Sequence, residues 1–231
     1  CSDNDGGSGY TCGMINVTDV SPPTFTNPRN ISLEGFKRHT NFTANITIID
    51  GQYVDNYMFS TNASGKWVNS SQIYLSGEDD IEAESITTIN LTYGQEGCWL
   101  YWASDNSGNS KSSDLYCFEV NNTLPYFDPS LPNTIIVNTS STFTYDANCT
   151  DVDEEELSWN ITEGVVGDVG INSNGVITHI PTEEEQGTDT LTISCSDPNG
   201  VTISSSTSYV INDTPPPSEL NVSVDGELKR L

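Results

Sequence analysis

Basic residues are scarce in this sequence. Its 231 residues include 7 Lys and Arg against 33 Asp and Glu, which gives a formal net charge of −26. Nucleic acids and anionic membrane surfaces are bound through Lys and Arg, so this balance argues against both as partners. The sequence also contains no apolar stretch of 18 residues, so we expect no membrane-spanning helix and no direct membrane insertion.

Residues that would carry catalysis are equally sparse. The two histidines, His39 and His179, fall in unrelated segments, and no G-x-S-x-G motif surrounds a serine. There is no C-x-x-C pair with the spacing of a zinc site. Carboxylates are so abundant that finding two together carries no information about glycosidase chemistry. We therefore expect a protein that is not an enzyme.

The low hydrophobic fraction, 34%, is a property shared with disordered chains. However, the 4 Trp, 10 Tyr and 7 Phe lie in runs that alternate apolar and polar residues, and no helical period occurs. This pattern is typical of antiparallel β-sandwiches with short strands. No signal-peptide pattern opens the chain, so we expect a mature form or a fragment.

The glycosylation pattern N-x-[ST] occurs thirteen times, whereas chance predicts about five occurrences for this composition. Four of these sequons fall in strand-like runs, at Asn45, Asn90, Asn148 and Asn160, and in each the neighbouring apolar residues would take the opposite face. The excess and this placement favour N-linked glycans on an exported, extracellular or cell-surface protein. The thirteen candidates are Asn16, Asn30, Asn41, Asn45, Asn62, Asn69, Asn90, Asn121, Asn138, Asn148, Asn160, Asn212 and Asn221.

The six cysteines favour disulfides, as expected in an oxidising exterior. Cys98 and Cys117 are symmetric about the turn signal DNSGNS and would face each other across a hairpin. Cys149 and Cys195 lie on the inward faces of two expected strands, with Trp159 between them. Cys1 and Cys12 stay open: they pair with each other if the first residues form a tail, and seek partners upstream if the chain continues an array.

Three segments repeat the same motif, in which the end of an expected strand is followed by a sequon and then by proline. They are INVTDVSPP at 15–23, VNNTLP at 120–125 and INDTPPP at 211–217. A second signal precedes or accompanies each, CSDNDGG at 1–7, ASDNSGN at 103–109 and CSDPNGV at 195–201. Such periodicity indicates an array of modules.

The repeat sets the expected domains. Residues 20–122 and 123–214 are expected to form two complete sandwiches. Residues 1–19 would be the last hairpin of a preceding module or an N-terminal extension. Residues 215–231 would be the first strand of a following module or a strand used in assembly; disordered tails are the alternative for both ends.

Within the first module we expect strands near 41–49, 55–60, 85–93, 97–104 and 113–121. Trp99, Tyr101 and Ala103 should face inward, so the Cys98–Cys117 disulfide should lie on the outer face. Within the second we expect strands near 134–138, 142–149, 157–162, 175–180, 188–196 and 201–211. There the Cys149–Cys195 disulfide should join two sheets through the core.

The second module resembles cadherin-like or dystroglycan-type Ig-like repeats, on the segments FTYDANCTDVDEEELSW, INSNGVITHIPTEEEQGTDTLTISCSDPNG and INDTPPP. The first resembles Ig-like repeats of bacterial and archaeal surface proteins, on DVSPPTF and WASDNSGNS. The resemblance implies tandem Ig-like sandwiches at a cell exterior, in stalks, adhesive ectodomains, surface layers or filaments. It fixes no adhesive residue.

Acidic residues are densest at 151–156 (DVDEEE). In a sandwich of this topology that loop neighbours the turn at 197–200 and the linker at 121–125. Clustered carboxylates with amide oxygens form the hard oxygen cage that Ca²⁺ prefers, and cadherin-like repeats often bind calcium between modules. The strict cadherin linker motif is absent, and a solvated acidic loop is the alternative. The candidate ligands are Asp151, Asp153, Asp197 and Asn199.

Three further features of the sequence are weaker indications of a site. The turn Asp105–Asn109, with Asp50 and Asp55, is a second candidate for a cation. The run GEDDIEAE at 77–84 is expected to be a solvated surface loop. Trp67, in a loop between two sequons, is a candidate for sugar binding or else a local packing residue.

Together these features predict a structural segment of a heavily N-glycosylated extracellular Ig-like array, in a filament, stalk or surface layer. Its partners would be copies of itself or neighbouring modules of the same array. The alternative is an adhesin or receptor ectodomain that binds a protein or glycan ligand. A third hypothesis is a carbohydrate-binding accessory to a secreted enzyme.

Overall fold

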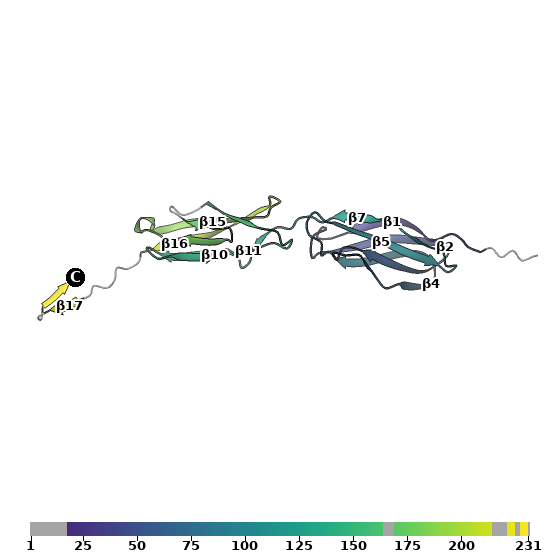
Figure 1. Cartoon of the computed structure of the whole chain (residues 1–231), viewed down its shortest axis with the longest axis horizontal. Helices are drawn as coiled ribbons and strands as arrows, with labels where there is room; N and C mark the ends of the chain where they lie inside the picture. The colour runs from purple at the N-terminus through teal and green to yellow at the C-terminus, as the bar shows by residue number, and fades with distance from the viewer. Residues whose placement is uncertain (1–17, 164–168, 214–220, 225–226, 231) are drawn as a thin grey trace, which may run out of the picture. The chain divides into compact units, whose positions relative to one another are not determined.

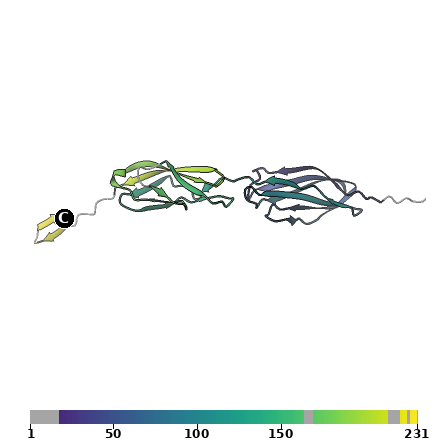
Figure 2. The same cartoon turned by 45° about the horizontal axis from the view of Figure 1, so that its top comes forward.

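The computed structural model describes residues 18–163, 169–213, 221–224 and 227–230, the last two ranges as backbone. The chain divides into two compact units, residues 1–121 and 122–231. Each unit has its own hydrophobic core and consists of strands in facing layers (Figures 1 and 2). The prediction of an all-β fold with tandem sandwiches is confirmed.

The described strands of unit 1 belong to a seven-stranded sheet that curls into two layers. They are β1 (Thr24–Ile31), β2 (Asn41–Thr61), β3 (Val68–Asn69), β4 (Ile73–Thr88), β5 (Glu96–Asp105), β6 (Ser110–Ser112) and β7 (Tyr116–Glu119).

Strand β2 is long because it serves both layers. Its first half pairs with β1 and the end of β4, and its second half pairs with β5, β3 and the start of β4. The register shifts between Ile49 and Val54, and Tyr53 adopts a φ of +72°, a conformation that is rare for a residue with a side chain. Gly77, with a φ of +101°, lies at the matching point of β4.

The core of unit 1 follows the alternation read from the sequence. Trp99, Tyr101 and Ala103 are fully buried, as expected. They pack with the inward residues of β2, which are Phe42, Ala44, Ile46 and Ile48, all with no exposed surface.

Two expectations for unit 1 are wrong. The acidic run 77–84 is not a loop: it lies within β4, where all five of its acids are exposed, Ile81 is half-buried and Ala83 is buried. The expected strand 85–93 ends at Thr88, and residues 89–93 are outside the strands, although Ile89 and Leu91 are buried and Asn90 is exposed. Burial alternates there because the segment closes the end of the core, not because it pairs in a ladder.

The described strands of unit 2 form three small sheets, in the orders β12-β15-β16-β9, β10-β14-β13 and β11-β8. They are β8 (Tyr126–Phe127), β9 (Thr134–Asn138), β10 (Phe143–Asp146), β11 (Cys149–Thr150), β12 (Ser158–Glu163), β13 (Gly170–Ile171), β14 (Val176–His179), β15 (Gly187–Ser196) and β16 (Thr202–Asn212), with a 3-10 turn, η1 (Glu183–Glu185).

One pairing departs from the expected antiparallel arrangement. Strand β9 pairs in parallel with β16, from Thr134 beside Ser208 to Asn138 beside Asn212. Parallel neighbours need a long crossover between them, and here most of unit 2 supplies it. The first long strand of the unit therefore lies against its last.

The core of unit 2 surrounds a disulfide. Cys149 of β11 and Cys195 of β15 are bonded and join two different sheets, as the sequence predicts. Trp159 of β12 pairs with Cys195 and donates its indole N–H to the Ala147 carbonyl at 3.1 Å. Gly175 lies against the same indole, where a Cβ atom would approach Trp159 Nε1 to 2.7 Å.

The ends of the chain remain largely outside the described residues. Cys1, Cys12 and Asn16 lie outside them, as does the expected terminal hairpin of residues 1–19 apart from Thr18 and Asp19. Near the other end, β17 (Asn221–Val224) pairs with β18 (Glu227–Arg230) in a hairpin. The two units meet in sequence between Asn121 and Asn122, while the expected boundaries at 19/20 and 214/215 stay predictions.

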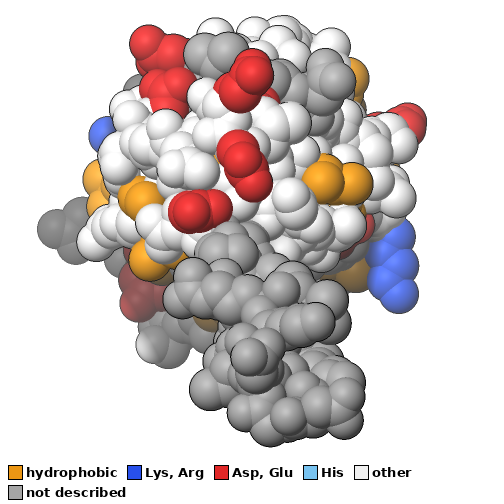
Figure 3. All heavy atoms as spheres, turned by 90° about the vertical axis from the view of Figure 1, so that its left-hand side faces the viewer, with side chains coloured by type: hydrophobic (Ala, Val, Ile, Leu, Met, Phe, Trp, Pro, Cys, Tyr) orange, Lys and Arg blue, Asp and Glu red, His pale blue; other side chains and the backbone are white. Residues whose placement is uncertain are grey.

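On the face that Figure 3 presents, acidic side chains are scattered among uncharged ones. Among the described residues, no helix combines the length and the apolar composition needed to cross a bilayer.

Candidate functional site

The repeated Asp turns have the same structure in both units. Asp105 Oδ1 accepts hydrogen bonds from the backbone N–H groups of Ser107 and Asn109, each at 2.8 Å. Asp197 Oδ1 accepts the equivalent bonds from Asn199 at 2.8 Å and Val201 at 2.9 Å. In both turns, a glycine with positive φ follows, Gly108 and Gly200, a conformation that glycine adopts without strain. The sequence repeat therefore encodes a carboxylate fixed at one end of each unit.

In unit 2 this carboxylate belongs to an acidic cluster. Asp151, Glu155 and Asp197 each offer a carboxylate oxygen, and these oxygens lie within 4.8 Å of one another. Asp153 adjoins them, because its N–H donates to Asp151 Oδ1 at 2.7 Å. Asp151, Asp153 and Asp197 are 7%, 3% and 4% exposed, which is unusual for acids that form no salt bridge with the described residues.

The segment that opens unit 2 is fastened to this cluster. Thr123 donates its backbone N–H to Asp153 Oδ2 at 2.8 Å, and its hydroxyl lies 2.7 Å from the same oxygen and 3.0 Å from Asp151 Oδ1. Asn122 donates its amide to Asp197 Oδ2 at 2.7 Å. Three of the eight carboxylate oxygens of Asp151, Asp153, Glu155 and Asp197 are thereby satisfied.

Three other carboxylate oxygens of the cluster have no such partner within the described part of the chain. Asp151 Oδ2, Asp153 Oδ1 and Glu155 Oε2 are buried and have no hydrogen-bond partner among the described residues. A buried carboxylate oxygen without a partner is costly, and neighbouring negative charges add to that cost. A hard divalent cation that binds oxygen ligands, such as Ca²⁺, would satisfy these atoms, so the residues present fit the ion that the sequence predicts.

Glu155 was missed by the sequence reasoning, because DVDEEE offers three consecutive glutamates and only the loop geometry distinguishes them. Burial raises the pKa of its carboxyl, the amide of Asn199 acts in the opposite direction, and the charges of Asp197, Asp151 and Asp153 raise it further. Asn199, the fourth predicted ligand, lies at the site but donates its amide nitrogen to Glu155 and toward Asn122.

Unit 1 has an equivalent acidic cluster, but its carboxylates are stabilised differently. Asp50 and Asp105 are joined by Asp19, and the expected Asp55 is not among them. Asn109, a residue of the turn itself, donates its amide to Asp105 Oδ2 at 2.8 Å and to the Asp19 carbonyl at 3.1 Å. In unit 2 the corresponding oxygen, Asp197 Oδ2, accepts its amide hydrogen bond from Asn122 instead.

The two buried acids of this cluster differ in their titration. Burial acts to raise the pKa of Asp105, but hydrogen bonds from Asn109, Ser107 and Gly108 lower it below its usual value. Burial raises the pKa of Asp50 despite a hydrogen bond from Gln52, and the nearby Asp105 and Asp19 charges raise it further. Unit 1 therefore handles its negative charge by hydrogen bonds at one acid and by easier protonation at the other.

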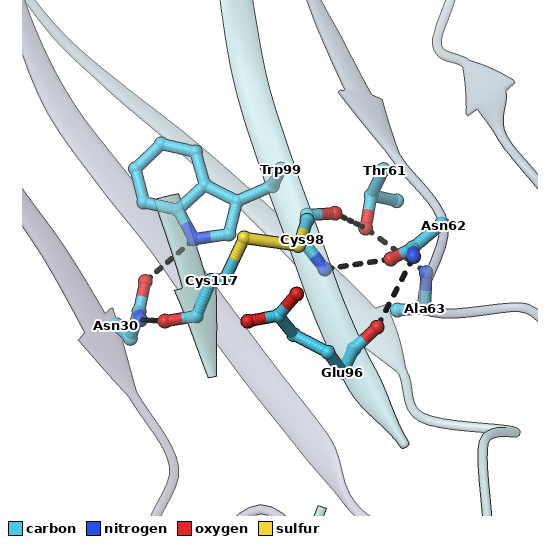
Figure 4. Close-up of a disulfide and its surroundings, with 8 residues drawn as sticks. All are labelled: Asn30, Thr61, Asn62, Ala63, Glu96, Cys98, Trp99 and Cys117. Carbon is cyan, nitrogen blue, oxygen red and sulfur yellow. Dashed lines mark hydrogen bonds between the residues drawn. A yellow bond between two sulfur atoms is a disulfide. The ribbon is translucent and has the colours of Figure 1, made fainter. Parts of the chain in front are cut away.

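A third group of potential ligands, Glu96, Cys98 and Cys117, holds no free thiolate, because the two sulfurs form the predicted disulfide (Figure 4). Cys98 lies on the face of β5 opposite the buried Trp99, and its disulfide clips the β5–β7 hairpin as the sequence predicts, although Cys98 itself is only 5% exposed. Asn30 and Asn62 bond to the hairpin from either side and close off this region.

The sequon asparagines differ in exposure. Those at Asn30, Asn45 and Asn62 are half-buried, and Asn16 and Asn221 have no described side chain. The exposed ones are Asn41, Asn69, Asn90, Asn121, Asn138, Asn148, Asn160 and Asn212.

Two further residues singled out by the sequence have clear positions. Trp67 is 51% exposed at the edge of unit 1 where β3 and β4 begin, and Tyr74 nearby in sequence is 70% exposed. His179 is buried, with Nδ1 3.0 Å from the Tyr209 hydroxyl and Nε2 3.6 Å from Glu185. Burial raises the pKa of Tyr209 to about 12, so this group is a hydrogen-bond partner at neutral pH, and His179 is not isolated as its sequence position suggested.

Comparison with known proteins gives a family resemblance for unit 2. Residues 122–211 match the sequence model of the bacterial Ig domain family. None of the curated proteins compared with the chain matches it.

Solved structures similar to the chain are Ig-like and related modules. An I-band fragment of titin is 16% identical with a TM-score of 0.35, and covers 84% of this chain and 67% of that one. A Drosophila N-cadherin fragment, EC1-3, is 14% identical with a TM-score of 0.37 and covers 84% and 68%. A putative α-galactosidase from Bacteroides fragilis is 18% identical with a TM-score of 0.33, and the chain spans only 19% of its length.

Proposed function

We propose that this chain is a structural segment of an N-glycosylated, extracellular array of Ig-like modules, stabilised in unit 2 by calcium. The observation that carries the proposal is that each unit closes its own core and its own disulfide within one chain. Modules that fold independently can be repeated without new contacts between distant parts of the chain. Bacterial Ig domains and disulfides both fit an extracellular location.

The calcium part of the proposal rests on the acidic cluster of unit 2. Asp151, Asp153, Glu155 and Asp197 would supply carboxylate oxygens, with Asn199 close by. Bound calcium would hold the loop 151–156, the turn 197–201 and the opening segment Asn122–Thr123 together. It would offset the repulsion among these four acids, of which Asp151, Asp153 and Asp197 are buried and Glu155 is half-buried.

Thermal unfolding tests this site directly. The chain is unfolded in chelator, in 2 mM Ca²⁺ and in 2 mM Mg²⁺. Calcium should raise the melting temperature of unit 2, and magnesium, which demands a tighter octahedral cage, should raise it less. The variant Asp153→Asn should lose most of the calcium shift, and Asp189→Asn, an exposed acid of the same unit, should keep it. Equal melting curves in chelator and calcium would contradict the calcium site.

The partners of such a segment would be neighbouring modules or further copies. Strand addition by residues 220–224 is one assembly mode. Strand β17 in this region already pairs with β18, so it would have to release that partner first. Deletion of residues 218–231 should abolish assembly if this mode operates, and assemblies that survive the deletion would reject it.

Immunogold labelling of intact cells tests the role as a whole. Antibodies raised against the folded chain should label a continuous or periodic structure at the cell surface. Labelling confined to the cell interior would overturn the extracellular array.

An adhesin is the second candidate, and the exposed Trp67 and Tyr74 favour it, because aromatic side chains at a surface commonly contact ligands. The sequon at Asn69 lies between them in sequence, which would crowd a ligand. Specific binding on a glycan or protein array that is lost in Trp67→Ala would favour this role. Since Ig-like domain families are generally non-enzymatic, the proposal includes no catalytic activity.

A further inference from the structure

Two sequon asparagines contact the disulfide-linked hairpin of unit 1 (Figure 4). Asn62, which follows β2, accepts a hydrogen bond from the backbone N–H of Cys98 at its Oδ1, 2.6 Å away. Its Nδ2 donates to the Glu96 carbonyl at 3.1 Å. The side-chain amide thus pairs with β5 as another strand would, and the backbone N–H of Asn62 adds a bond to the Cys98 carbonyl.

Asn30 of β1 holds the other strand of the hairpin. Its Nδ2 donates to the Cys117 carbonyl at 3.3 Å, and its Oδ1 accepts the indole N–H of Trp99. Trp99 is fully buried, so this indole N–H depends on a protein partner. Both amide atoms of Asn30 and both of Asn62 are therefore committed to the protein.

An N-linked glycan bonds to the nitrogen that these hydrogen bonds use. The Asn62 side chain contacts β5 through both Oδ1 and Nδ2. Of the two hydrogens on Nδ2, the one donated to the Glu96 carbonyl is therefore the one cis to Oδ1. A trans N-glycosyl amide places the first sugar carbon on that side. The sugar would then lie where the Glu96 carbonyl is, and the glycan at Asn30 would have to enter beside Trp99.

Other sequons of the same unit have the opposite arrangement. Asn41 and Asn69 are exposed, and each uses its oxygen to accept a hydroxyl at 2.8 Å, from Thr88 and Ser60 respectively. Among the described residues, no hydrogen bond uses Nδ2 of either side chain. These two nitrogens are available for a sugar in the folded protein.

We propose that Asn30 and Asn62 are structural residues that fasten the Cys98–Cys117 hairpin, and that N-linked sugar in unit 1 is confined to the sequons with exposed, uncommitted nitrogens. The inference rests on the proposed glycosylation and divides the sequons that the sequence treats as equal. It assigns a protein ligand, the β5–β7 hairpin, to two of them.

Site occupancy in the folded, secreted protein tests the division. Enzymatic removal of N-glycans in heavy-oxygen water marks each occupied asparagine by mass. Asn41 and Asn69 should be marked, and Asn30 and Asn62 should not. Marking of Asn30 or Asn62 to the level of Asn41 would overturn the inference.

Variants that remove a sequon without touching its asparagine give a matched control. Ser64→Ala removes the sequon of Asn62, and Ser71→Ala removes that of Asn69. The first should leave the mass of the intact protein unchanged apart from one oxygen, and the second should also remove one glycan. Loss of a glycan in Ser64→Ala would contradict the assignment.

Melting curves separate this inference from the glycosylation it rests on. The variants Asn30→Gln and Asn62→Gln should lower the melting temperature of unit 1 by about 5 °C or more, because each breaks two buried or half-buried hydrogen bonds. Asn41→Gln and Asn69→Gln should lower it by less than about 2 °C. If no sequon carries sugar, the glycosylation proposal fails, and these four curves alone decide the structural role. Equal effects in all four would reject it, and Asn62→Asp, which keeps the acceptor, gives a milder variant should the glutamine forms fail to fold.

Discussion

At the residue scale, a proton and the proposed calcium ion would compete for the same carboxylate, Glu155. Its burial and the charges of its acidic neighbours raise its pKa, so in the absence of a cation the protonated form is favoured more in the folded chain than in the unfolded one. A raised pKa contributes stability that is present below the unfolded value and is lost as the pH rises through the folded value.

The first prediction follows from this sign. In chelator, the melting temperature of unit 2 should fall as the pH rises from about 4 toward 7, because Glu155 becomes charged among other acids. In calcium the fall should be smaller, so the calcium-induced shift should be larger at pH 7 than at pH 4.5. Calorimetry at both pH values measures it. A calcium shift of the same size at both would show that the ion does not use this carboxylate.

The acids of unit 1 lead to a paired prediction. Asp105→Asn should destabilise unit 1 by about 1–2 kcal/mol, because hydrogen bonds to a charged acceptor are weakened. Asp50→Asn should stabilise the same unit at pH 7, because it removes a charge that burial disfavours and keeps the oxygen that accepts from Gln52. Denaturant unfolding at pH 7 gives both values, and two changes of the same sign would contradict the account.

The sequence predicts residues of the acidic cluster well where a turn fixes them. Asp197 lies in a repeated Asp-to-Gly turn whose hydrogen bonds follow from its residues alone, and Asp151 directly follows a short strand. Glu155 and Asp19 were not identified, because their positions depend on how a loop and a linker return to the turn. The partial burial of Asn30 was not predictable either, because its partners Trp99 and Cys117 are distant in the sequence.

At the scale of the elements, glycine marks the places where backbone approaches a side chain. Gly175 has a φ of +80°, and a Cβ atom there would lie 2.7 Å from Trp159 Nε1 and 3.1 Å from the Ala147 carbonyl. The turn between β13 and β14 can therefore pass beside the indole only without a side chain.

Gly175→Ala is accordingly expected to destabilise unit 2 by about 2 kcal/mol or more, through backbone strain and displacement of Trp159. Gly170→Ala is the control, because its φ is not in the positive region and an added Cβ would meet only Thr178 Oγ1 at 3.7 Å. Tryptophan fluorescence, to which the half-buried Trp159 contributes, measures the unfolding midpoint of both variants in denaturant. Similar midpoints for the two variants would contradict the steric argument.

Some elements were predictable and others were not. Strand β9 has the expected bounds, Thr134–Asn138, because a short apolar alternation lies between turn residues. Strand β1 was not expected, since Asn27 and Pro28 interrupt its pattern; it tolerates them at a register shift beside β2. The sequence also did not predict that the expected strands 41–49 and 55–60 join into β2, because the residues around the bend near Tyr53 resemble a turn.

At the scale of the whole molecule, the disulfides limit how far each unit can extend. They close loops of 19 residues in unit 1 and 46 residues in unit 2. Extended chain spans about 3.5 Å per residue, so reduction should lengthen the unfolded units by about 7 nm and about 16 nm.

Single-molecule stretching of the chain measures this prediction. The contour length released by unfolding should increase by those two amounts when a reducing agent is added. A Cys98→Ser, Cys117→Ser double variant should show the smaller increment without reduction and should keep the larger one dependent on it. Unfolding lengths that ignore the reducing agent would contradict the assigned bonds.

The parallel pairing of β9 with β16 determines how unit 2 would respond to tension. Strand β9 lies near the start of the unit and β16 at its end, so a pull applied to the two ends slides one strand along the other. The backbone hydrogen bonds between the two strands then carry the load simultaneously, in shear, instead of breaking one after another. Unit 2 would resist pulling far better than its modest size suggests, and its weakest direction would lie across the chain.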